Sequence, residues 1–162
     1  MKSRTLLSAG ALFALALAPV IASAEPDPRL ERLMDKTELK YKFDDDNDAL
    51  VAFDSTWGGE DVVVYVNNNT SDLGDLTVRD VWCVAFVSDD IPGGVILQAM
   101  SQNDDLKIGA WTWFQLKNEK EILKFSYAAP TDLSGAQLAD VIQAIASTVD
   151  KFRKEHHDEV PE

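Results

Sequence analysis

Apolar and polar positions alternate along two consecutive stretches in the second half of the chain. In residues 108–115 this period of two places Trp111 and Trp113 on one face of an extended strand and smaller apolar side chains on the other. Residues 122–127 alternate in the same way, and the polar residues 117–120 between the stretches suit a hairpin turn. The pattern predicts a β-hairpin whose first strand is apolar on both faces.

A spacing of three and four residues replaces this alternation near the C-terminus. Ser134 and Gln137 form the pattern of a capping box, which starts a helix. The apolar residues that follow lie on one stripe: Leu138, Val141, Ile142, Ile145, Val149 and Phe152. A long helix that covers the sheet is therefore expected, followed by a charged, frayed tail at residues 154–162.

Two shorter helices are expected earlier in the chain. Asp27 followed by Pro28 is typical of a helix start, and the apolar stripe after it fades near Tyr41. Residues 88–92 carry a second start signal, and the polar residues 103–105 end the helix that follows.

Apolar stretches between the first two helices predict three strands, at residues 50–53, 62–66 and 76–87. The acidic run at residues 44–48 is expected to be a turn between two extended pieces. Together these elements predict a single α+β domain. Its antiparallel sheet has about five strands, and its elements follow the order α-β-β-β-α-β-β-α.

The first 24 residues have the pattern of a secretory signal peptide. Lys2 and Arg4 precede an apolar run, and residues 22–24 form a small-residue cleavage site. The alternative is an uncleaved membrane anchor, but the apolar run is short for the ~20 residues that span a bilayer. We therefore expect a periplasmic or secreted protein with a folded domain at residues 25–153 and no membrane association after cleavage.

The chain is strongly acidic, with a formal net charge of -13. Removing residues 1–24 deletes two positive charges and no negative ones, which leaves -15. This charge argues against nucleic acids and anionic membranes as partners, because both attract basic patches. It serves either solubility or the binding of a ligand of opposite charge.

Few side chains could carry out catalysis. Cys83 is the only cysteine, so an internal disulfide is impossible, and its apolar surroundings in sequence predict a buried side chain rather than a reactive thiol. Both histidines, His156 and His157, lie in the expected tail, which would have to fold back onto a buried strand to reach Cys83. With Asp158 they could bind a transition metal only loosely. We expect a protein that is not an enzyme and holds no cofactor.

The acidic turn matches a calcium-binding loop only in part. Asp44, Asp46 and Asp48 occupy the first three ligand positions of an EF-hand. Ala49 then stands where the loop needs glycine, and Ser55 stands where it needs a bidentate glutamate. We therefore expect a solvated turn and no metal site.

The order of elements resembles the YbjN-domain family, whose fold is similar to that of type III secretion chaperones. The resemblance covers roughly residues 28–153 and is carried by residues 39–53, 97–103 and 131–152. Gln98 departs from the asparagine that often follows the leucine at this place in the family. The resemblance implies a non-enzymatic sensory, chaperone-like or regulatory module that binds another protein, although the export signal differs from cytoplasmic secretion chaperones.

The aromatic side chains of the hairpin form either core or a binding surface. As a surface, Trp111, Trp113 and Tyr127 would line a groove for an extended or helical segment of an unidentified protein partner. The alternative function is a small-ligand carrier or sensor with a cavity between sheet and helices. Fold relatives that dimerise suggest a possible homodimer, with its interface on the second helix at Val95, Ile96 and Met100.

Overall fold

The computed structural model describes residues 26–161. The predicted signal peptide at residues 1–24 lies outside the described residues. Within them, no helix is both long enough and apolar enough to cross a membrane.

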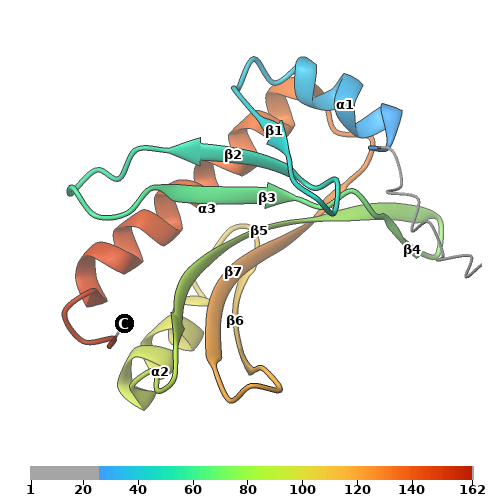
Figure 1. Ribbon diagram of the computed structural model, residues 1–162. Helices are drawn as coiled ribbons and strands as arrows, with labels where there is room; N and C mark the ends of the chain where they lie inside the picture. Colours follow the sequence, from blue (N-terminus) through green and yellow to red (C-terminus); the bar gives the residue numbers. More distant parts are fainter. Residues whose placement is uncertain (1–25, 162) are drawn as a thin grey trace, which may run out of the picture.

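The described part of the chain has the expected α+β class, with three helices and one antiparallel sheet (Figure 1). In chain order the elements are α1 (Pro28–Asp35), β1 (Lys42–Phe43), β2 (Ala49–Phe53), β3 (Val62–Val66), β4 (Ser71–Leu73), β5 (Leu76–Ser88), α2 (Gly93–Gln102), β6 (Ala110–Gln115), β7 (Glu121–Pro130) and α3 (Gly135–His156).

The sheet has seven strands, so the prediction of about five was wrong. Five strands rather than three separate α1 from α2. The two additional strands are β1, with two residues, and β4, with three exposed residues in a polar stretch. Neither is long enough to show an alternating pattern, and Gly74 provides the positive φ of the tight turn that joins β4 to β5.

The strand order is β1-β2-β3-β5-β7-β6, and β4 pairs with one end of β5. β5 pairs with β7 along most of its length but with β3 over only three residue pairs, from Val64–Cys83 to Val66–Val81. A β-bulge interrupts β5 between Val84 and Phe86. Beyond it, β5 and β7 curve away from β2 and β3 (Figure 1).

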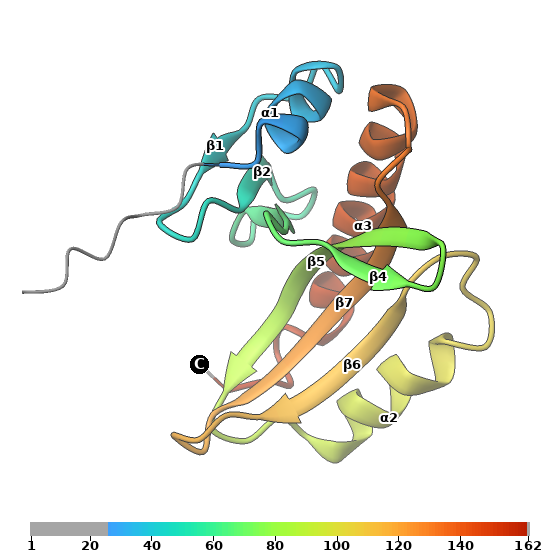
Figure 2. The same cartoon turned by 90° about the vertical axis from the view of Figure 1, so that its right-hand side faces the viewer.

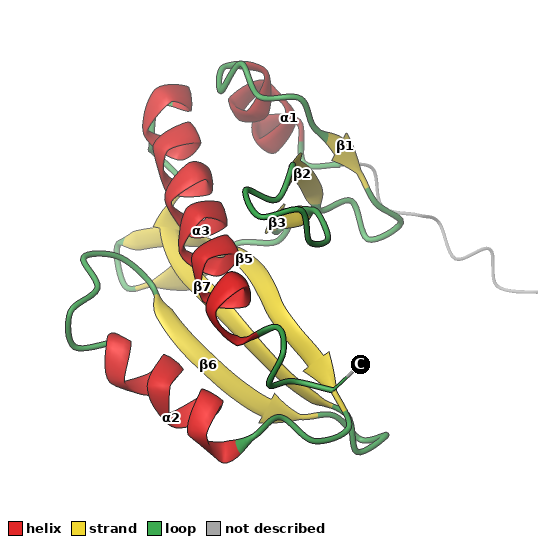
Figure 3. Ribbon diagram, turned by 90° about the vertical axis from the view of Figure 1, so that its left-hand side faces the viewer, coloured by secondary structure: helices red, strands yellow, loops and turns green. Residues whose placement is uncertain are grey.

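α3 lies across one face of the sheet, and α2 lies beside β6 (Figure 3). In the opposite view the strands lie in front of α3 (Figure 2). Buried side chains of α3 and of the sheet form the core together with Leu30 and Met34 of α1. The expected capping box at Ser134 and Gln137 and the expected helix start at Asp27 are both confirmed.

The expected frayed tail was wrong at its beginning. α3 continues through His156, which is buried and packs its ring 4.4 Å from that of Phe152. His156 Nδ1 lies 2.7 Å from Glu159 Oε1, and the ring of His157 lies 4.5 Å from that of Trp57. These contacts hold the last turn of the helix against the domain.

Candidate functional site

The hairpin of β6 and β7 forms as predicted, but it places Trp111 in the core. The side chain is 1% exposed, and its ring lies 5.2 Å from Phe125 and 4.5 Å from Phe152. Its indole Nε1 donates to Gln102 Oε1 at 3.0 Å. Trp111 therefore cannot belong to an exposed binding surface, because α2 and α3 cover it.

Trp113 lies on the same face of β6 and is 42% exposed. Phe114 and Leu116, next along the chain, are exposed as well. Tyr127, the third residue of the predicted surface, is half-buried on β7 opposite Val81 and packs against the core. Of the three residues of the predicted surface, only Trp113 is exposed to solvent.

The backbone of β6 forms an edge of the sheet, because within residues 26–161 β6 pairs only with β7. The N–H of Leu116 donates to the carbonyl of Lys120 across the hairpin, so even-numbered residues direct their backbone groups at β7. Trp111, Trp113 and Gln115 then direct theirs at the open edge. Edge groups of this kind pair readily with another strand.

Asn103 occupies this edge at Trp111. Its Oδ1 accepts from the Trp111 N–H at 2.7 Å, and its Nδ2 donates to the Trp111 carbonyl at 3.2 Å. The side-chain amide thus makes the two bonds that a neighbouring strand would make. At Trp113 and Gln115, the residues that the structure describes provide no such partner for the outward backbone groups.

The second helix, proposed from sequence as a dimer interface, directs most of its predicted residues inward. Val95 is buried, and Ile96 and Met100 are half-buried against the core. Leu97 is instead the outward residue, with 72% of its surface exposed. Val95 is therefore unavailable to a partner, and Leu97 is the large apolar side chain that α2 exposes.

The sheet face opposite the helices carries a row of side chains from four strands. Tyr65 and Trp82 stack in parallel, with ring centroids 4.2 Å apart. Lys124 places its ammonium 5.3 Å from the Trp82 ring and 5.6 Å from the Phe114 ring. The stacked rings and the ammonium group of Lys124 therefore contact one another, and together they cover this face of the sheet.

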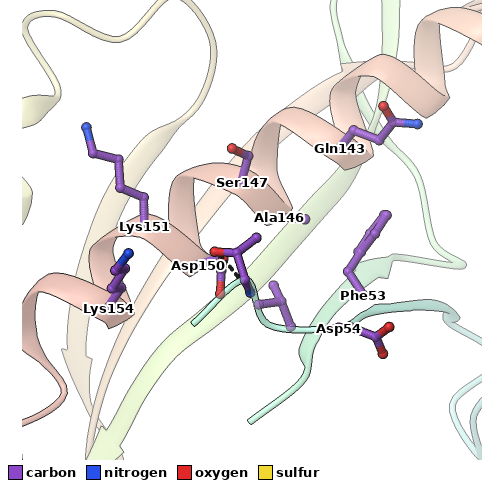
Figure 4. A pocket seen from close by; sticks show the side chains of 10 residues that line it. Phe53, Asp54, Gln143, Ala146, Ser147, Asp150, Lys151 and Lys154 are labelled. Atoms are coloured by element: carbon purple, nitrogen blue, oxygen red, sulfur yellow. Dashed lines mark hydrogen bonds between the residues drawn. The ribbon is translucent and has the colours of Figure 1, made fainter. Parts of the chain in front are cut away.

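A cavity of about 500 Å³ lies between α3 and the end of β2 (Figure 4). Phe53, Val62 and Ala146 supply its apolar surface, and polar residues of α3, among them Lys151 and Lys154, line it too. The cavity opens along one side of α3 rather than being enclosed between helices and sheet.

Asp150 fixes one wall of this cavity. It is 6% exposed and accepts hydrogen bonds from both the N–H and the hydroxyl of Thr56 in the β2–β3 loop. Burial raises the pKa of Asp150, but polar groups of the β2–β3 loop, the hydrogen bonds from Thr56 foremost and then the side chains of Ser55 and Trp57, together outweigh that effect and leave the pKa lowered. The carboxylate therefore stays ionised and attaches the loop to α3.

Most of the side chains considered from sequence for catalysis or metal binding are buried or hydrogen-bonded within the fold. Burial raises the pKa of Cys83 to about 12, which keeps the side chain a neutral thiol. In the acidic turn, Asp44 Oδ1 accepts from the N–H groups of Asp46 and Asp48, and Asp48 Oδ1 accepts from the N–H of Asn68. Within residues 26–161 no group of three acidic, histidine or cysteine side chains is arranged to hold a metal ion.

No model of a known protein family matches this chain, and no curated protein matches it. The open part of β6 is the strongest structural indication of function in the described residues. Sequence reasoning identified Trp113, but it placed Asn103 only at the end of the second helix and in the stretch 97–103 that carries the family resemblance, not at a strand edge. Asn103 precedes Trp111 by eight residues, and an asparagine side chain at this separation can reach the backbone of the strand. This spacing is the signal in the sequence that could have indicated the contact.

Proposed function

We propose that this protein is an exported, non-enzymatic module of the YbjN type that binds another protein in a chaperone-like manner. The observation that carries the proposal is the open backbone of β6 at Trp113 and Gln115, flanked by the exposed side chains of Trp113, Phe114 and Leu116. A partner segment in extended conformation would add a strand there. Backbone hydrogen bonds would supply affinity, and the flanking apolar side chains would supply specificity.

The surroundings of this edge favour a protein segment over a small molecule. α2, which lies beside β6, carries no charged residue and exposes Leu97. Apolar surface next to unpaired strand groups is the arrangement that strand addition requires.

Affinity capture from periplasmic extract tests the proposal, with residues 25–162 as bait. Gln115→Pro removes an outward N–H without removing a bond to β7, and Trp113→Ala removes the exposed indole. Both variants should lose a protein that the wild type captures. Leu73→Ala, which truncates a large apolar side chain on β4 that is even more exposed than Trp113, should retain it. Capture that persists in both β6 variants would reject the site.

The open cavity beside α3 favours a second candidate, the carriage of a small ligand. Its size of about 500 Å³ lies within the range of small-molecule sites. Ser147 is exposed and lines the cavity, so Ser147→Trp should fill it without disturbing the core. If extracted protein carries a ligand that this variant lacks, the carrier function is supported. If both carry none, it is rejected.

A further inference from the structure

Asn103 closes one end of the β6 edge and leaves the other end open. It caps the C-terminus of α2, and both polar groups of its amide bond to the backbone of Trp111. A strand added to β6 from the hairpin end would pair with Gln115 and Trp113 and would then meet the Asn103 amide. The groups it would need at Trp111 are already bonded.

We propose that Asn103 sets the register and length of partner binding, restricting strand addition on β6 to Trp113 and Gln115, and that the occupant is an extended segment of a positively charged partner protein. This inference rests on the proposed function and deepens it. A partner residue opposite Trp113 would place its side chain on the same face as the exposed indole. The next pairing position, at Trp111, would not be available, because the Asn103 amide already bonds to its backbone groups.

The charge of the chain selects this occupant over a second copy. Two copies that each carry a net charge of -13 repel one another. Asp104 and Asp105, both exposed, follow directly after Asn103, whose amide closes the edge at Trp111. Lysine or arginine at the end of a bound segment would meet these carboxylates, whereas the apolar flank formed by α2 and Trp113 suits uncharged side chains between them.

Two synthetic peptides test the restriction. Both are acetylated and amidated, begin and end with lysine, and contain alternating valine and threonine, with three such residues in the short peptide and five in the long one. In calorimetry the wild type should bind both with affinities equal within about twofold. Asn103→Ala frees the Trp111 groups, so it should bind the long peptide roughly tenfold more tightly than the short one, because two hydrogen bonds are gained.

Further variants separate the possible failures. Asn103→Asp keeps an acceptor for the Trp111 N–H but loses the donor, so it should show a smaller preference for the long peptide; it also serves if Asn103→Ala does not fold. If the wild type already prefers the long peptide by the full factor, the role of Asn103 is overturned while the binding edge stands. If no protein binds either peptide, the proposed function itself fails at this site.

The assignment of the occupant is tested separately. Peptides with glutamate in place of lysine should bind at least fivefold more weakly at low salt. Equal binding of the two charge types overturns the charged-partner assignment. A wild-type dimer in sedimentation that Gln115→Pro converts to monomer would also overturn it, because a second copy would then occupy the edge.

Discussion

Trp111 and Trp113 lie on the same strand and on the same face, yet the first is 1% exposed and the second 42% exposed. Both residues belong to β6, so the difference in exposure comes from the side chains that cover them. At Trp111 the rings of Phe125 and Phe152 and the side chains of Gln102 and Asn103 close the surroundings. At Trp113 the described chain provides no comparable set of contacts. Alternation along a strand thus determines the face of a side chain, while distant elements determine its burial.

The largest expected effect separates the two tryptophans by stability. Trp111→Ala should lower the free energy of unfolding by about 3–5 kcal/mol, because it removes a fully buried side chain and leaves a cavity. Trp113→Ala should cost less than about 1 kcal/mol, since much of its ring already contacts water. Urea denaturation of both variants measures the difference. Equal losses would mean that Trp113 is core in solution and unavailable to a partner.

Asp150 attaches the β2–β3 loop to α3 through a charged group, whereas the hydrogen bonds of Trp111 join neutral groups. Asp150→Asn should cost about 1.5–3 kcal/mol at neutral pH, because hydrogen bonds from Thr56 to an ionised carboxylate become weaker ones. The folded state lowers the pKa of Asp150 below its ordinary value of 3.8. Its stabilisation is therefore complete above that value and is lost as the pH falls through it towards the folded pKa.

Unfolding measured from pH 7 to pH 2.5 tests this sign. The gap in stability between wild type and Asp150→Asn should be constant down to about pH 5 and should narrow below pH 4. A gap that widens on acidification would contradict the assignment. The gap between wild type and Trp111→Ala should change little over the same range, because the contacts of Trp111 contain no ionisable group.

The same contrast explains which parts of the fold could be predicted from the sequence. The start of α3 was predictable, because the Ser134 and Gln137 side chains bond within one turn of the chain. The hairpin of β6 and β7 was predictable, since its signal is an alternation over adjacent residues. β4 was not, because three exposed residues gain their strand conformation only by pairing with β5.

The candidate site was predictable only in part, for a related reason. Sequence placed Trp111 and Trp113 together on one face, which is correct, but burial of Trp111 depends on Phe152 of α3, 41 residues away along the chain. The role of Asn103 depends on the path of the loop between α2 and β6. The continuation of α3 to His156 likewise depends on rings, Phe152 and Trp57, that the charged composition of the segment did not reveal.

The Asn103→Ala variant tests how strongly the Asn103 side chain stabilises the edge of β6 at Trp111. Loss of two edge hydrogen bonds should cost about 1–2 kcal/mol in unfolding, because water can reach part of the freed edge. The amide hydrogen of Trp111 should then exchange with solvent at least tenfold faster, and that of Trp113 should keep its rate. Unchanged exchange at Trp111 would show that Asn103 does not protect the edge in solution.

Gln102→Ala should have the smallest effect and should sharpen the comparison further. It removes the acceptor of the Trp111 indole N–H but leaves the ring between Phe125 and Phe152. Gln102 is half-exposed, so water can replace its oxygen, and the expected cost is about 0.5–1 kcal/mol. Trp111 should remain as protected from iodide quenching as before in a background that lacks the other tryptophans. Greater quenching of Trp111 in that assay would mean that the polar contact, rather than the packing of rings, keeps this end of β6 closed.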